Sequence, residues 1–134
     1  MNILFVEDSG IILLHYKKLF ALREDINTYV ATTIKRAKTI MSNEEINIIT
    51  LDISLPDGNG MDFLKWVKQE YFKMCVIMMS CYTEEMIQSE AKKFGANYFL
   101  DKGDCEKLPK MISEINYLNL QNDFSGGGVK EYFS

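Results

Sequence analysis

The sequence predicts an α/β protein in which five strand–helix units build one doubly wound parallel sheet. Two observations lead to this fold class. Short, continuous apolar runs, typical of strands buried on both faces, alternate along the chain with segments whose apolar residues recur at helical spacing. Such alternation favours an open parallel sheet with helices on both faces. The 134 residues, 47% of them hydrophobic and 25% charged, suit a single globular domain.

The elements can be placed one after another. Strands are predicted at 3–6, 26–31, 47–51, 75–79 and 98–100. The first is wholly apolar, and the second is rich in Thr, Tyr and Val. A helix follows each strand, and the apolar stripes of these helices are, in chain order, Ile12, Tyr16, Leu19 and Phe20; Val30, Ile34, Ala37 and Met41; Phe63, Leu64, Val67 and Tyr71; Ile87, Ala91 and Phe94; and Leu108, Met111, Ile112, Ile115 and Leu118. Leu55 to Gly60 is a turn cluster, and Gly95 is placed to end the fourth helix. We expect the domain to span 1–120 and residues 121–134 to be a flexible, glycine-rich tail or the start of a linker.

Composition excludes several classes of function. The net charge is −4, so the chain lacks the basic excess of a nucleic-acid binder. His15 is the only histidine, which excludes a site with two histidine ligands. Three cysteines without a C-x-x-C pair argue against a disulfide framework or a zinc site and favour a reducing, cytoplasmic location. We expect no signal peptide and no membrane-spanning segment.

Polar side chains stand at the carboxyl ends of four predicted strands, where open α/β sheets bind their ligands. Strand one ends in Glu7-Asp8, strand three in Asp52, strand four in Ser80 and strand five in Lys102. Each has an ordinary explanation when taken alone: a helix cap, a turn former or a solvated lysine. Together they form a constellation on one edge of the sheet.

This constellation suits phosphoryl transfer. Clustered carboxylates repel one another unless a cation lies among them, and hard oxygen ligands suit Mg²⁺. A carboxylate beside such an ion can attack phosphorus and form an acyl phosphate. Lys102 and the Ser80 hydroxyl would then contact phosphoryl oxygens.

The chain resembles the receiver domain of bacterial two-component response regulators from about Asn2 to Leu118. The motifs that carry the resemblance are Glu7-Asp8, Asp52-Ile53-Ser54-Leu55-Pro56-Asp57-Gly58-Asn59-Gly60, Ser80-Cys81-Tyr82 and Phe99-Leu100-Asp101-Lys102. The resemblance implies a flavodoxin-like strand order of 2-1-3-4-5, as in chemotaxis receivers. It also implies a cytoplasmic phosphoprotein of a two-component system or phosphorelay, which is not an enzyme acting on a separate substrate.

The resemblance assigns a role to each matching residue. Asp52 would be the phosphoacceptor, and Lys102 would pair with the phosphoryl group. Mg²⁺ or Mn²⁺ would be held by Glu7, Asp8, Asp52 and the backbone carbonyl of Ser54. Ser80 would be the switch hydroxyl and Phe99 the aromatic switch residue, which we expect to follow inward on phosphorylation. The side chains of Ser54 and Tyr82 would tune dephosphorylation.

Two positions depart from the family pattern. Gly103 follows Lys102 where the family usually has a proline joined by a cis bond, so we expect a trans bond or a more mobile loop. Phe99 lacks the hydroxyl of the tyrosine that is common at its position.

The implied partners are a histidine kinase or phosphotransfer protein and a downstream protein, with no nucleic acid or membrane contacted by this chain. The downstream partner would meet the face of helix four, strand five and helix five, and a phosphorylation-dependent dimer is one form it could take. Candidate residues on that face are Met86, Gln88, Ser89, Lys92, Lys93 and Asp104.

Three alternative functions stay open at this point. One is a receiver-like scaffold that is never phosphorylated. Another is an aspartate-nucleophile phosphohydrolase, which usually has a second aspartate where this chain has Ser54. The third is a flavodoxin-like electron carrier, but no phosphate-cradling loop follows strand one.

Overall fold

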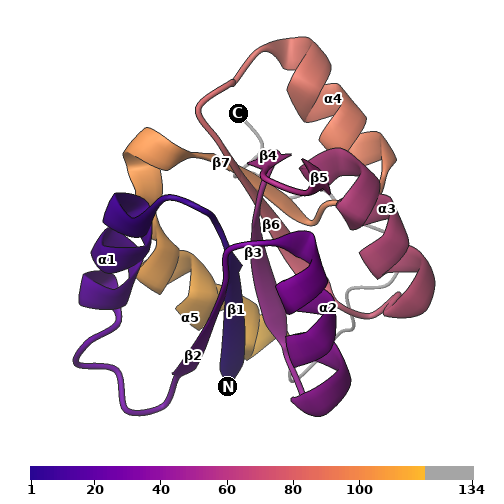
Figure 1. Ribbon diagram of the computed structural model, residues 1–134. Coiled ribbons are helices and arrows are strands. Elements are labelled where there is room, and N and C mark those ends of the chain that lie inside the picture. Colours follow the sequence, from indigo (N-terminus) through magenta and orange to yellow (C-terminus); the bar gives the residue numbers. More distant parts are fainter. Residues whose placement is uncertain (120–134) are drawn as a thin grey trace.

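The computed structural model describes residues 1–119, and the predicted tail 121–134 lies outside them. A five-stranded parallel sheet forms the middle of the molecule, with helices on both faces (Figure 1). The elements are, in order, β1 (Asn2–Val6), α1 (Gly10–Leu19), β2 (Asn27–Ala31), α2 (Ile34–Asn43), β3 (Ile48–Asp52), β4 (Ser54–Leu55), β5 (Gly58–Asn59), α3 (Gly60–Glu70), β6 (Cys75–Ser80), α4 (Glu85–Lys93), β7 (Tyr98–Asp101), the 3₁₀ segment η1 (Lys102–Lys107) and α5 (Leu108–Asn119).

The sheet order is β2-β1-β3-β6-β7, which confirms the predicted order 2-1-3-4-5 when the five sheet strands are counted alone. The order reverses at β1 and β3, because β1 pairs with β2 on one side and with β3 on the other. Ligands of open α/β sheets bind at such a reversal, outside the carboxyl ends of the strands. Glu7, Asp8 and Asp52 therefore follow or end the two strands that flank this point.

Alternate residues of each strand supply two core layers. In β1, Ile3 and Phe5 pack with α1 and α5, whereas Leu4 and Val6 pack with α2, α3 and α4. Residues of β3 and β6 are buried along their whole length, which explains their continuous apolar runs.

Two local features differ from the sequence expectation, and a third agrees with it. Val30, predicted to begin a helical stripe, lies in β2, and α2 begins at Ile34. The predicted turn cluster contains a two-stranded hairpin, β4–β5. Gly95 directly follows the C-cap of α4 with a φ of 99°, a conformation that favours glycine, so the predicted helix end is confirmed. Within residues 1–119, no helix is long and apolar enough to cross a membrane.

Candidate functional site

Three carboxylates meet at the carboxyl edge of the sheet. Glu7 is 2% exposed and Asp52 is 7% exposed, whereas Asp8 lies in solvent. One carboxylate oxygen from each of the three residues lies within 4.8 Å of the others. Oxygen ligands at this spacing, one of them open to water, fit a hard divalent cation such as Mg²⁺. The acidic residues predicted from the strand ends are thus brought together.

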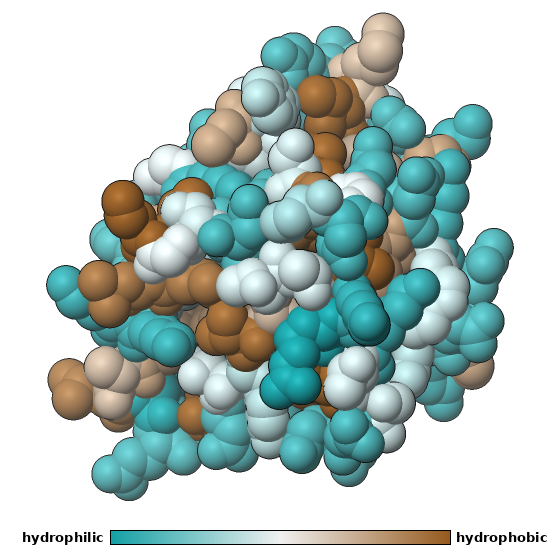
Figure 2. All heavy atoms as spheres, in the orientation of Figure 1, coloured by the Kyte–Doolittle hydropathy of each residue, from teal (hydrophilic) through white to brown (hydrophobic). Residues whose placement is uncertain are grey.

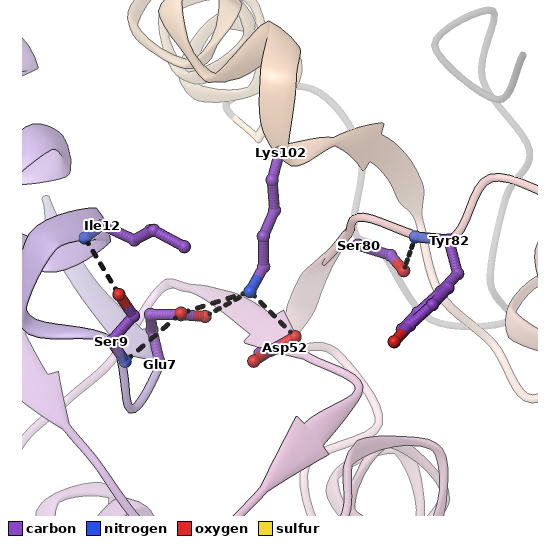
Figure 3. A network of polar contacts seen from close by, with 7 residues as sticks. All are labelled: Glu7, Ser9, Ile12, Asp52, Ser80, Tyr82 and Lys102. Atoms are coloured by element: carbon purple, nitrogen blue, oxygen red, sulfur yellow. Dashed lines mark hydrogen bonds and ion pairs between the residues drawn. The ribbon is translucent and has the colours of Figure 1, made fainter.

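Lys102 reaches into this cluster from the end of β7. Its Nζ lies 2.8 Å from Glu7 Oε2, 3.1 Å from Glu7 Oε1 and 3.1 Å from Asp52 Oδ1. Figure 3 shows the ammonium group between the two carboxylates, with Asp52 between Lys102 and Ser80. The side chain is only 11% exposed, so solvent screens these ion pairs much less than pairs on the surface. In this state the lysine offsets one of the two negative charges that Glu7 and Asp52 bring to the buried pocket.

The charges of the site shift one another's protonation. Burial raises the pKa of Glu7 and the nearby Asp52 charge adds to this, although hydrogen bonds from Lys102 oppose it. Burial alone would lower the pKa of Lys102, but its hydrogen bonds to Glu7 and Asp52 outweigh burial and raise it. The ammonium form of Lys102 is therefore favoured at neutral pH.

The loop after Lys102 is held without a proline. The Lys102–Gly103 bond is trans, as every peptide bond of the described residues is. Asp101 Oδ1 accepts a hydrogen bond from the backbone N–H of Gly103 at 2.8 Å, which caps the 3₁₀ segment that begins at Lys102. Of the two expected alternatives, a trans bond or a more mobile loop, the structure shows the trans bond, and the Asp101 carboxylate orders the turn.

Ser80 is the last residue of β6 and is buried. Its Oγ accepts a hydrogen bond of 2.8 Å from the backbone N–H of Tyr82, so its hydroxyl hydrogen is free to face another group. Ser80 does not cap α4, because the N-cap of that helix is Glu84. The side chain of Tyr82 is 57% exposed, and Ser54 is exposed at the start of β4.

Phe99 is already buried, with 1% of its surface exposed, in the layer that packs against α2, α3 and α4. The ring is thus already inward in this state, and the expectation that it follows inward on phosphorylation stays a prediction. Of the candidate contact residues, Met86, Ser89, Lys92 and Lys93 are exposed, and Gln88 and Asp104 are half-buried.

The hairpin after Asp52 is fixed to two helices. Asp57 accepts hydrogen bonds from the N–H groups of Ile34 at 2.8 Å and Lys35 at 3.0 Å, at the start of α2. Asn59 caps α3 by accepting from Met61 N–H at 2.7 Å. Sequence reasoning placed both residues in a turn and missed these roles. Asn59 directly before a helix is a recognisable capping signal, whereas the contact of Asp57 with α2 joins residues 22 and 23 positions apart and has no local signal.

The family model for the response regulator receiver domain matches residues 3–113. The chain belongs to this family. Among curated relatives, the response regulator protein PilR of Pseudomonas aeruginosa is 30% identical over 101 residues, which are 75% of this chain and 22% of PilR. The sporulation initiation phosphotransferase F of Bacillus subtilis is 29% identical over 124 residues, which are 91% of this chain and 97% of that protein. The chain spans only 22% of the length of PilR and 44% of the length of the KDP operon transcriptional regulatory protein KdpE of Escherichia coli.

Solved receiver structures share the fold. A CheY-like receiver domain protein of Methanospirillum hungatei superposes with a TM-score of 0.77 at 22% identity, covering 90% of this chain and 98% of that one. The isolated receiver domain of RcsB from Salmonella enterica gives a TM-score of 0.80 at 16% identity, covering 98% and 94%. Receiver domains of two-component response regulators act in phosphorylation-dependent signalling, bind Mg²⁺ at an acidic pocket, and interact with histidine kinases or phosphotransfer proteins and with effectors.

Proposed function

We propose that this receiver domain accepts a phosphoryl group on Asp52 from a phosphohistidine and uses it to switch a protein-binding surface. The observation that supports this most directly is the placement of Lys102 Nζ 3.1 Å from Asp52 and 2.8 Å from Glu7. A fixed positive charge lies where negative charge would develop on the phosphoryl oxygens, and such positioning is most of what a protein contributes to phosphoryl transfer.

Each residue has a task in this reaction. An Asp52 carboxylate oxygen forms the new bond to phosphorus, and the bond from phosphorus to the donor's histidine nitrogen breaks, with the electron pair leaving on that nitrogen. Lys102 turns from the carboxylates to a phosphoryl oxygen. Glu7, Asp8, Asp52 and the Ser54 carbonyl would hold Mg²⁺, which supplies neutralisation of the attacking and phosphoryl oxygens.

Ser80 would couple phosphorylation to the surface. For its hydroxyl to donate to a phosphoryl oxygen, Ser80 must move toward Asp52, which strains the bond it accepts from Tyr82 N–H. The loop after β6 would then rearrange beside the exposed residues of α4. Only a difference in affinity between two pre-existing states is needed for this population shift.

The groove beside α1 is where the phosphodonor would dock. Ile11 is 84% exposed and Leu14 is 56% exposed, and both line a groove of about 440 Å³ that Lys102 also lines. Brown, apolar atoms gather at the left of Figure 2, where α1 lies in Figure 1. An apolar patch next to the acceptor site suits an amphipathic helix that carries the histidine.

Intact-mass measurement tests the acceptor. Acetyl phosphate with Mg²⁺ should add one phosphoryl group to the wild-type chain and none to Asp52→Asn, and undiminished labelling of the variant would refute the assignment. A beryllium fluoride mimic of the phosphoryl group separates this function from the scaffold alternative, because a scaffold would not respond to it.

A second experiment tests the docking groove. Ile11→Ser or Leu14→Ser should slow transfer from a phosphohistidine donor and leave acetyl phosphate labelling unchanged. Leu22→Ser is the matched control, because Leu22 is 96% exposed but does not line the groove. Equal effects of all three substitutions on transfer would contradict the docking site.

A further inference from the structure

Tyr16 carries a buried hydroxyl that the proposed reaction does not yet use. The residue is 1% exposed on the inner side of α1, and its ring packs against Phe5 with 5.2 Å between centroids. Its hydroxyl oxygen is fully buried and has no hydrogen-bond partner among the described residues. Buried polar groups are nearly always paired, so such a hydroxyl calls for an explanation.

The hydroxyl lies on the side of the sheet that leads to the acidic cluster. Helical side chains lean toward the N-terminus of their helix, and α1 begins at Gly10, just after Glu7 and Asp8. Phe5, which contacts the Tyr16 ring, precedes Glu7 by two residues and so shares its face of β1. Burial raises the pKa of Tyr16, and the negative charge of Glu7 adds to this increase.

Glu7 would lack hydrogen-bond donors if Lys102 moved away from it. Its acceptors are served by Lys102 at 2.8 and 3.1 Å and, at a longer 3.4 Å, by the backbone N–H of Ser9. If Lys102 turns to a phosphoryl group on Asp52, the carboxylate of Glu7, which is 2% exposed, loses its two close donor contacts, and Mg²⁺ held at one of its oxygens would leave the other oxygen without a donor. A donor without an acceptor and an acceptor that is losing its donor thus lie in the same buried layer.

We propose that Tyr16 is a positioning residue for phosphoryl transfer, whose hydroxyl donates a hydrogen bond to Glu7 when Lys102 leaves for the phosphoryl group. This inference rests on the proposed function of Asp52 and Lys102. The hydroxyl stabilises the state with Lys102 displaced and is unsatisfied in the state with Lys102 on Glu7, so it shifts the equilibrium between them.

The test is Tyr16→Phe, which removes only the hydroxyl, measured by thermal unfolding and by titration with beryllium fluoride. In metal-free protein, loss of an unsatisfied buried hydroxyl should raise the melting temperature by about 2–5 °C. With Mg²⁺ present, affinity for beryllium fluoride should fall about tenfold, as expected for losing a hydrogen bond to a charged group. A purely structural role would not give effects of opposite sign in the two states.

Tyr98→Phe is the matched control. Tyr98 is a second buried tyrosine of the same core layer, at the start of β7 and away from the carboxyl edge. Its substitution should leave beryllium fluoride affinity unchanged.

A double-mutant comparison tests the partner. In a Glu7→Gln background, with Mg²⁺ at a concentration that saturates both variants, the effect of Tyr16→Phe on beryllium fluoride affinity should shrink to less than about threefold, because the charged acceptor is gone. Unchanged affinity for the mimic in Tyr16→Phe, or an equal loss in the Glu7→Gln background, would overturn the inference. If Asp52→Asn binds the mimic as well as wild type does, the proposed function itself fails, which is a separate outcome.

Discussion

Gly60→Ala is the substitution that probes most sharply how Asp52, the proposed phosphoacceptor, is positioned. Gly60 is the first residue of α3 and packs directly on the end of β3. A Cβ atom at this position would lie 2.0 Å from the carbonyl oxygen of Asp52 and 2.8 Å from the Cα of Ile53. The N–H of Gly60 also donates to Ile53 O at 2.6 Å, so the helix cannot retreat without weakening that bond. Because contacts under 3.0 Å are essentially never seen, the two backbones must separate by about 1 Å.

The magnitude follows from these contacts. Overpacking costs about 1–3 kcal/mol, and weakening the Gly60–Ile53 hydrogen bond adds about 1 kcal/mol. Alanine recovers at most about 1 kcal/mol through its better helix propensity. The expected net loss is about 1–3 kcal/mol, or roughly 3–15 °C in melting temperature for a domain of this size. Since a displacement of about 1 Å can slow a reaction about a hundredfold, labelling of Asp52 by acetyl phosphate should slow by one to two orders of magnitude.

Gly10→Ala is the matched control for this experiment. Gly10 is also the first residue of a helix and follows the N-cap Ser9, but a Cβ there would meet no atom within 4 Å. Its substitution should leave labelling unchanged and be neutral or stabilising by up to about 1 kcal/mol. Thermal unfolding and intact-mass time courses on both variants give the answer. Equal melting temperatures and equal labelling rates for the two would refute the argument from close packing.

Four further results are expected. Asp8→Asn should raise the metal-free melting temperature by about 2–4 °C, since it relieves repulsion within the acidic cluster, and should abolish Mg²⁺-dependent labelling; an unchanged labelling rate would refute the metal role. Burial lowers the pKa of Lys68 to about 8, so the free energy of unfolding of wild type should increase by about 1–2 kcal/mol, after allowance for solvent screening, as pH rises from 8 toward 10.5. If the difference in this free energy between wild type and Lys68→Met stays constant over that range, this account is wrong. Amide exchange at Tyr82 should change on adding beryllium fluoride, because its N–H donates to Ser80; identical exchange would contradict the switch. The aspartyl phosphate should be long-lived, because neither Ser54 nor Tyr82 carries an amide or carboxylate to orient water, and a Ser54→Asn, Tyr82→Glu double variant that decays no faster would refute this.

The sheet was predictable because each buried strand is a continuous apolar run, and β3 and β6 have no exposed residue to interrupt the signal, whereas the strand order came from the resemblance to receiver domains. The edge strand β2 was harder to delimit, since its first two residues are exposed. The hairpin β4–β5 was read only as a turn, because its two-residue strands leave no periodicity to detect.

The site was predictable as a set of residues but not as a set of contacts. Strand ends place Glu7, Asp52 and Lys102 on one edge, whatever their side chains do. Lys102 contacts Glu7 as well as Asp52 because its long side chain reaches across the sheet from the end of β7. A local sequence pattern does not predict such a long-range contact. One signal was available and overlooked: Ile11 and Leu14 fall outside the predicted apolar stripe of the first helix, and both proved to be exposed.

The position of Lys102 explains how one pocket can be stable before phosphorylation and still be ready for it. A buried Glu7 beside Asp52 would be costly without a cation, because burial and like charge both favour its protonation. Lys102 supplies that cation from within the chain, and its raised pKa keeps it charged while it does so. A phosphoryl group on Asp52 adds negative charge to a site where an ammonium is already present, so Lys102 has only to turn from Glu7 and need not be brought in from solvent. The free energy of the switch then includes the interactions that replace Lys102 at Glu7, which would be those with Mg²⁺ and, in our proposal, with the Tyr16 hydroxyl.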